Sequence, residues 1–327
     1  MSTRRFVDST ITFVVLMAVI AIGFAKTQAI EDWWKLRDYT PSVNVAALAR
    51  QDTMTAAARH LFYVNHPALL SSTTTFRQDC PENEQTIVLG CYRPGEGGIF
   101  IYSVTDPRLI GVQQVTAAHE MLHAEYERLS SADRNNVDRM LNDFYTNDIH
   151  DQRIIDTINA YKKTEPNDVV NEMHSVFGTE IGNLPAPLEA YYGRYFTNRA
   201  AIVGFANQYQ GEFTTREAQL NADDAQLVGL KTQIDSEEAT LGAELAQINA
   251  DRARLDAERN SGQIDQYNAG VDSYNSEVET YDSGIKNQQS DIADYNGLVN
   301  ERNAIAGELA SLEKSLDTRQ TPQTVSQ

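Results

Sequence analysis

The spacing of apolar residues changes twice along this chain, and each change predicts a boundary between parts of different structure. An apolar run without a charge extends from Ile11 to Ala25. Mixed patterns follow, and the last third repeats apolar residues at intervals of seven, which is typical of a coiled-coil seam. The pattern predicts an N-terminal membrane anchor or signal peptide at 1–30, a folded domain at 31–205, a coiled-coil helical hairpin at 206–317 and a polar, disordered tail at 318–327.

Two helical seams are predicted in the last third, separated by the break Arg259-Asn-Ser-Gly-Gln263. The second seam runs from Ile264 to Leu316, and a break of this composition lets it fold back on the first. The sequence therefore predicts an antiparallel hairpin of two long helices. Gly270, Gly284 and Gly297, together with the tyrosines of the seam, are expected to make it weaker than an all-Leu coil, because glycine is unfavourable inside a helix. The first seam comprises Phe213, Leu220, Leu227, Ile234, Leu241, Ile248 and Leu255.

The folded domain combines helical and β-type patterns. Two runs rich in β-branched and aromatic residues, Thr86–Tyr92 and Gly98–Val104, flank turn residues that end at Gly97, which predicts a β-hairpin. Helical spacing predicts helices at 43–63, 133–146 and 154–162. The expected class is α+β, a mostly helical domain with a small β-hairpin or sheet that is followed by the long coiled-coil hairpin.

The apolar run near the N-terminus suits two interpretations. Its helical length of roughly 22 Å is short of the ~30 Å hydrocarbon core of a membrane, and it follows Arg4 and Arg5 as a signal peptide would. Trp33 and Trp34 lie where an aromatic belt at the outer interface is expected, which favours an uncleaved anchor. We therefore expect a single-pass cell-membrane protein with most of the chain outside the cytoplasm; the alternative is secretion after signal cleavage.

Cysteine usage agrees with an extracytoplasmic location. Cys80 and Cys91 are the only two cysteines, and they close a short loop. Outside the cytoplasm such a pair is most simply a disulfide, which contributes about 3 kcal/mol through the unfolded state. The alternative is a pair of free thiols that bind a metal, but the sequence offers no third ligand nearby.

The chain is strongly acidic, with a formal net charge of −19. Residues 212–317 hold 22 Asp plus Glu against 8 Lys plus Arg, so −14 of this charge lies in the predicted coil. A nucleic-acid partner is excluded, because binding its backbone calls for a basic face. The charge keeps the coil soluble. Its expected role is that of a spacer, a partner-binding arm, a self-association element or a flap that limits access to the folded domain.

The candidate chemistry lies in Thr116-Ala-Ala-His119-Glu120-Met-Leu-His123. Two histidines four residues apart fall on one helix face and can bind one Zn²⁺, while Glu120 can act on a water beside it. A surface helix that carries two histidines by chance is the alternative, but the whole chain has only 6 histidines. The segment resembles the His-Glu-x-x-His signature of zinc metallopeptidases. Glu125 departs from that signature, in which a hydrophobic residue is usual.

A catalytic zinc normally has three protein ligands, so a further one must come from elsewhere in the chain. The metzincin continuation is absent, because Tyr126 and Leu129 stand where it needs Gly and His. Asn171-Glu172 resembles the second motif of the gluzincins, and this resemblance implies Glu172 as the third ligand. Those enzymes usually have an acidic residue four positions later, where this chain has Val176. The alternatives for the third ligand are Glu180, His174, His150 and Asp148.

The resemblance also implies a zincin-like fold, Zn²⁺ as cofactor and a protein or peptide substrate. Glu120 is expected to take a proton from the attacking water and return it to the leaving amine. In such enzymes the strand before the metal helix commonly lies at the sheet edge along the cleft, so Ile99–Val104 is expected to pair with an extended substrate. A group that stabilises the oxyanion is also required. The candidates are Tyr191, Tyr192, Tyr195 and His174.

The sequence thus predicts a membrane-tethered, extracytoplasmic, zinc-dependent peptidase. The alternative function is that of a non-catalytic cell-envelope interaction protein with a structural or degenerate zinc site and a coiled-coil partner-binding arm. The intact Glu120 favours the peptidase, because a structural zinc site has no need of a general base between its ligands.

Overall fold

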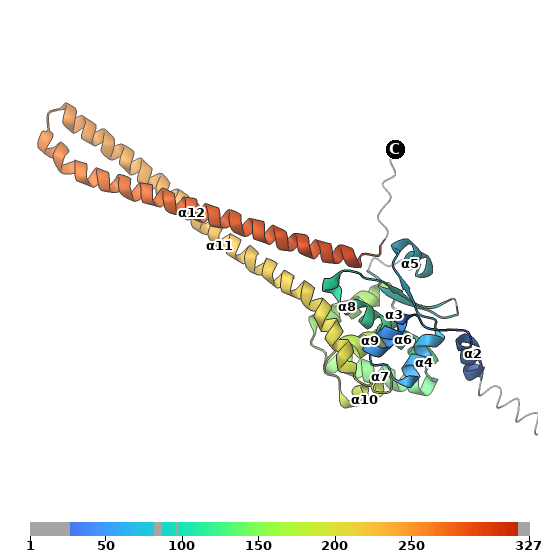
Figure 1. Cartoon of the computed structure of the whole chain (residues 1–327). Helices are drawn as coiled ribbons and strands as arrows, with labels where there is room; N and C mark the ends of the chain where they lie inside the picture. Colours follow the sequence, from blue (N-terminus) through green and yellow to red (C-terminus); the bar gives the residue numbers. More distant parts are fainter. Residues whose placement is uncertain (1–26, 82–86, 96, 320–327) are drawn as a thin grey trace, which may run out of the picture. The chain divides into compact units, whose positions relative to one another are not determined.

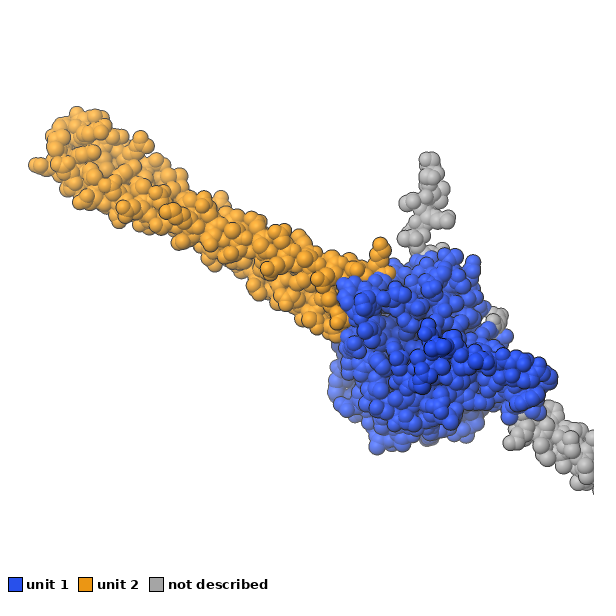
Figure 2. Space-filling view, viewed as in Figure 1, with its two compact units in different colours: residues 1–210, 315–327 blue, residues 211–314 orange. Residues whose placement is uncertain are grey.

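The computed structural model describes residues 27–81, 87–95 and 97–319. They are mostly helical, with a small three-stranded sheet and two long C-terminal helices, which confirms the predicted α+β class (Figure 1). The chain divides into two compact units, residues 1–210 with 315–327 and residues 211–314 (Figure 2). The finer prediction of a zincin-like domain stays a prediction.

Three strands form the sheet of the first unit: β1 (Ala68–Leu70), β2 (Gly90–Arg93) and β3 (Gly98–Tyr102). Their order is β1-β3-β2, with β1 parallel and β2 antiparallel to β3. The predicted hairpin is therefore present. The expected edge position of Ile99–Val104 is wrong, because β1 pairs with the other side of β3 and leaves β2 at an edge of the described sheet.

Several helices of this unit begin at side-chain caps. Ser42, Thr55, Ser72 and Ser130 each accept a hydrogen bond from the backbone N–H three residues later. Such a bond pairs a donor that a helix start leaves without a partner. The elements are α2 (Thr27–Leu36), α3 (Val43–Gln51), α4 (Ala56–Val64), α5 (Thr73–Asp79), η1 (Pro107–Leu109), α6 (Val112–Arg128), α7 (Ser131–Asn147), α8 (Gln152–Thr164), α9 (Val169–Glu180) and α10 (Ala186–Tyr192).

Helix α6 packs against α9, α3, α4 and the sheet, so it organises the core of the first unit. Gly178 on α9 lets the two helices approach closely. A Cβ atom at this position would lie 2.5 Å from Leu122 Cδ1 and 2.7 Å from Tyr192 Cε1. The buried side chains of α6 and α9 include Ala117, Ala118, Met121, Leu122, Met173, Val176 and Phe177.

The predicted disulfide between Cys80 and Cys91 is present. It joins the residue after α5 to strand β2, and Phe76 packs against it in a small apolar cluster. Val88 packs against the same cluster. The cross-link therefore ties the chain just before and within β2 to α5.

The second unit is an antiparallel helix pair, made of most of α11 (Arg199–Asn260) and α12 (Ile264–Leu316). Gly262 has φ +80° in the connecting turn, a left-handed conformation that favours glycine. Arg216 forms an ion pair with Glu308, which joins the start of the unit to its end. The predicted fold-back at the break is therefore present.

Two glycines of this helix pair face seam leucines at short range. A Cβ at Gly270 would lie 2.8 Å from Leu255 Cδ2, and a Cβ at Gly284 would lie 2.8 Å from Leu241 Cδ2. Both glycines thus allow close approach of the helices, a role that the sequence analysis did not foresee.

The predicted membrane anchor, Ile11–Ala25, lies outside the described residues. Among the residues that are described, no helix is both long enough and apolar enough to cross a membrane, which corrects the prediction of a transmembrane, single-pass protein. The long helices α11 and α12 carry charges along their length. Helix α2 is tied to the folded unit, because its buried Asp32 pairs with Arg128 of α6 at 2.9 Å and with His60 at 3.1 Å.

The contact at Gly178 gives a test of this packing. We expect Gly178→Ala to lower the free energy of unfolding by about 1–3 kcal/mol, because the added methyl group overpacks the contact between α6 and α9. Gly204→Ala is the matched control: a Cβ at this helical position meets nothing within 4 Å, and we expect stabilisation of up to ~1 kcal/mol. Urea unfolding measures both, and equal effects of the two substitutions would contradict the close packing.

Candidate metal centre

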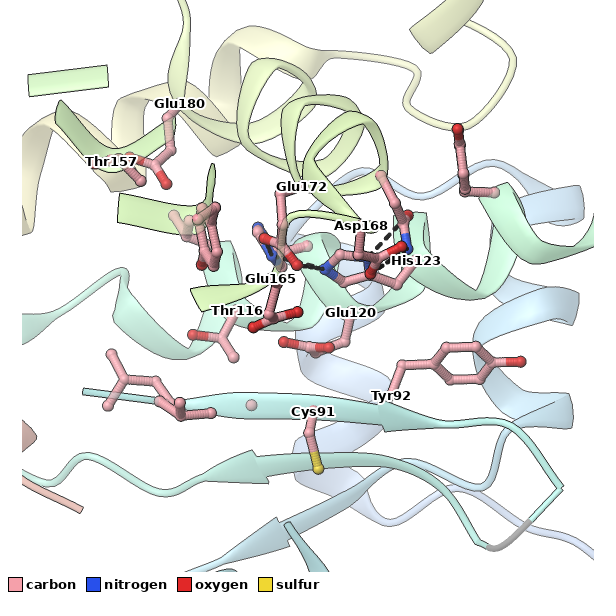
Figure 3. A pocket seen from close by; sticks show the side chains of 18 of the residues that line it. Cys91, Tyr92, Thr116, Glu120, His123, Thr157, Glu165, Asp168, Glu172 and Glu180 are labelled. Carbon is pink, nitrogen blue, oxygen red and sulfur yellow. Dashed lines mark hydrogen bonds and ion pairs between the residues drawn. The ribbon is translucent and has the colours of Figure 1, made fainter. Parts of the chain in front are cut away.

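Helices α6 and α9 bring two histidines and a glutamate together. His119 and His123 lie one turn apart on α6, and their Nε2 atoms are 3.0 Å from each other. Glu172, in the first turn of α9, places Oε1 3.3 Å from His123 Nε2 and Oε2 3.6 Å from His119 Nε2 (Figure 3). The structure therefore groups the three residues that the sequence analysis expected to bind zinc.

This donor set fits a metal ion. Glu172 is 6% exposed, and its Oε2 atom makes no hydrogen bond. A buried carboxylate oxygen without a hydrogen bond is unfavourable unless a cation compensates it. Two imidazoles and one carboxylate are also a ligand set of catalytic zinc sites, which keep a further position for water or substrate.

The ring orientation of His123 is fixed by a short chain of hydrogen bonds. His123 Nδ1 lies 3.0 Å from Asn171 Oδ1, and the amide of Asn171 donates to Asp168 at 3.1 Å. Because an amide oxygen only accepts, Nδ1 carries the proton and Nε2 keeps its lone pair for a metal. Position 176, where the gluzincin pattern has an acidic residue, holds a valine. The carboxylate at the end of this hydrogen-bond chain is that of Asp168, at the start of the same helix.

Glu120 lies between these ligands and strand β2 (Figure 3). It is 5% exposed. A Cβ at Gly90 would lie 2.8 Å from Glu120 Oε1 and 2.5 Å from Thr116 Cγ2, so only glycine lets the strand pass this close to α6. The close approach places a carboxylate beside the candidate metal ligands.

The charges around the centre shift the pKa values of its residues in different directions. Burial lowers the pKa of His119, but its close contact with the Glu172 carboxylate and the negative charge of Glu120 outweigh it and raise the pKa to about 9. For His123, burial dominates and lowers the pKa. Burial acts to raise the pKa of Glu172, yet the positive charge of the histidines lowers it overall. At pH 7 the metal-free centre therefore holds one protonated imidazole.

The centre opens into a cleft of about 640 Å³ in the first unit. One wall is the edge strand β2 with the residues before it, and α6, α8 and α9 contribute the others. Tyr92 and Tyr161 line the cleft, and sequence reasoning missed both as site residues because neither belongs to a motif. The acidic lining residues are Glu120, Glu127, Glu165, Asp168, Glu172 and Glu180.

The other candidates for the third ligand lie apart from the histidine pair. Glu180 lines the cleft but pairs with Arg153 at 2.5 Å and with Gln210 at 2.8 Å. His174 is fully buried, lies 2.8 Å from the Tyr191 hydroxyl, and has its pKa lowered to about 3 by burial. His150 and Asp148 belong to no candidate metal-binding group among the described residues.

The tyrosines proposed from sequence as oxyanion donors are packing residues. Tyr191, Tyr192 and Tyr195 are buried in the core and do not line the cleft. Tyr195 donates a hydrogen bond to Glu125, the residue that departs from the zinc-peptidase signature. This bond gives a partly buried charged group a partner, which accounts for an acidic side chain at a position that is usually hydrophobic.

Comparison of the chain with family models, with curated proteins and with solved structures finds no match. The resemblance to zinc peptidases therefore rests on Thr116–Ala124 and Asn171–Ser175 alone.

The ligand assignment predicts a graded loss of zinc binding. We expect Asn171→Ala to lower zinc affinity by about 10–100-fold, as loss of an outer-shell partner does, and Glu172→Ala to lower it further because a ligand is lost. Glu180→Ala is the control that keeps stoichiometric zinc, since Glu180 is engaged by Arg153 and Gln210. Metal analysis and competition with a zinc chelator measure the series. Loss of zinc from the Glu180 variant alone would reverse the assignment.

The pKa values predict that zinc binding releases protons. His119 is protonated at pH 7, because its pKa is raised to about 9, and it must become neutral to bind a metal. We expect release of about one proton per zinc at pH 7, and an affinity that rises about tenfold per pH unit until the pH approaches that pKa. Titration calorimetry in buffers of different ionisation enthalpy measures the release. No release at pH 7 would show that His119 is neutral or not a ligand.

Proposed function

We propose that the chain is a zinc-dependent peptidase in which His119, His123 and Glu172 bind the metal and Glu120 is the general base. The observation that carries this proposal is the convergence of the three ligands beside a buried glutamate at the wall of a cleft. A purely structural zinc site usually has four protein ligands and no open position, whereas this group has three among the residues that the structure describes.

The residues around the centre have defined parts in the proposed reaction. A bound zinc supplies Lewis-acid activation of the attacking water and of the scissile carbonyl. Glu120 accepts the proton of that water and later donates it to the leaving amine. Asn171 and Asp168 hold the imidazole of His123 in orientation. The burial of Glu120 at the wall of the cleft limits the access of bulk water to its carboxylate.

Strand β2 is the proposed binding edge for the substrate backbone. Tyr102 donates a backbone hydrogen bond to Leu89 at 2.8 Å, so the groups of Leu89 face β3. Because the direction alternates along an antiparallel strand, the backbone groups of Gly90 and Tyr92 face away from β3. An extended peptide can add to this edge with its backbone close to Glu120, which makes proteins or peptides in extended conformation the proposed substrates.

Tyr161 is the proposed donor to the oxyanion that forms at the scissile carbonyl. It lines the cleft from α8. Burial acts to raise the pKa of the Glu172 carboxyl, and the neighbouring histidines lower it. A hydrogen bond with the Tyr161 hydroxyl lowers it further. A phenolic donor beside a metal ligand lies where negative charge develops during attack.

The base assignment is tested by Glu120→Gln. We expect this variant to bind zinc as the wild type does and to lose about 10²–10⁴-fold in the rate of hydrolysis of a casein-type substrate, because the amide cannot accept the proton. Glu127→Gln is the matched control: Glu127 lines the same cleft and accepts a hydrogen bond from Tyr92, which an amide oxygen also accepts. Wild-type protein that binds zinc and hydrolyses nothing would leave the non-catalytic alternative. Activity untouched by Glu120→Gln would contradict Glu120 as the general base.

A further inference from the structure

The segment after the helix pair returns to the first unit and binds beside the cleft. The end of α12 and the residues that follow, Ser315–Arg319, belong to that unit. The Thr318 hydroxyl donates to the backbone oxygen of Val88 at 2.7 Å, and Arg77 of α5 donates to the backbone oxygens of Thr318 and Arg319. Ser315 also donates to Asp106 at 3.2 Å. Thr318, which the sequence analysis placed in a disordered tail, is 4% exposed.

The hydrogen bond from Thr318 engages the chain just before β2. Val88 lies two residues before Gly90 and lines the cleft. Its backbone oxygen accepts the Thr318 hydroxyl at 2.7 Å. A peptide that continues past Gly90 along this part of the chain therefore meets Thr318, which competes with it for that oxygen.

The bond also lies a short distance from the candidate general base. Gly90 is the point at which the strand passes Glu120. Val88 is two residues away along an extended chain, which corresponds to about 7 Å at ~3.4 Å per residue. A peptide that pairs with β2 beside Glu120 has room for about two residues in this direction before it meets Thr318.

Helix α5 holds both Val88 and the returning segment Ser315–Arg319. Val88 packs on the apolar cluster of Phe76 and the disulfide, and Arg77 lies on the same short helix, α5. The two carbonyl groups that Arg77 binds belong to the returning segment. Movement of this segment away from Val88 therefore requires loss of several hydrogen bonds together.

We propose that Thr318 closes one end of the substrate groove and limits the number of substrate residues that the cleft accepts on that side. The inference rests on the proposed peptidase function. A substrate pairs with Gly90 and Tyr92 alone, so the scissile bond lies about two residues from one end of the bound peptide, and the cleft favours trimming near a chain end over cleavage inside a long extended segment.

Peptides of graded length test this limit on the full chain. A peptide that the wild type cuts at one mapped bond is extended one residue at a time, first at its N-terminus and then at its C-terminus. We expect kcat/KM to fall about tenfold or more once the peptide exceeds about two residues on one side of the bond, and to change little with length on the other. The double variant Arg77→Ala, Thr318→Gly is expected to remove most of this loss, because it releases the segment from Val88.

Two controls and one further test variant separate the outcomes. Thr318→Ser keeps the hydroxyl and is expected to keep the limit, and Thr280→Val removes a comparable hydroxyl-to-carbonyl bond in the second unit and is expected to change nothing. Thr318→Gly alone carries the test if the double variant does not fold. A wild type that cleaves peptides of all lengths equally well on both sides overturns the inference but not the proposed peptidase function. A length limit that persists in the double variant or in Thr318→Gly has the same meaning. A zinc-loaded wild type that cleaves no peptide overturns the proposed function itself.

Discussion

The burial of one carboxylate between two imidazoles is the constraint on which the first unit depends. The oxygens of Glu172 lie 3.3 and 3.6 Å from the two ring nitrogens, at the contact of the two central helices. A buried carboxylate is destabilising unless charge or hydrogen bonds compensate it. In the proposed function a bound cation neutralises the carboxylate. Metal binding and the packing of α6 on α9 then both stabilise the folded state of the first unit.

Two glycines set the spacing on either side of α6. Gly178 lets α9 approach one side, which brings Glu172 within reach of the histidines. Gly90 lets β2 approach the other side, where its backbone contacts Glu120 and Thr116. A larger residue at either position pushes an element away from the centre. The candidate site therefore results from backbone proximity on both sides of one helix, which carries His119, Glu120 and His123.

The local part of the site could be predicted from sequence, because residues four apart on a helix share a face whatever surrounds them. Glu172 needed the further resemblance of Asn171-Glu172 to a known motif. The edge strand could not be predicted: β1 has only three residues, too few to show a period, and its pairing with β3 decides which strand is at the edge. Thr318 lies far from the motif in sequence and reaches Val88 only through the fold.

Diffraction at the zinc absorption edge, on crystals grown with stoichiometric zinc, tests the central claim most directly. We expect one anomalous peak within about 2.0–2.2 Å of His119 Nε2, His123 Nε2 and a Glu172 oxygen, with an open position on the side of Glu120. A peak elsewhere, such as among Glu165, Asp168 and Glu172, a peak closed by a fourth protein ligand, or no peak at all would contradict a catalytic zinc centre in this cleft.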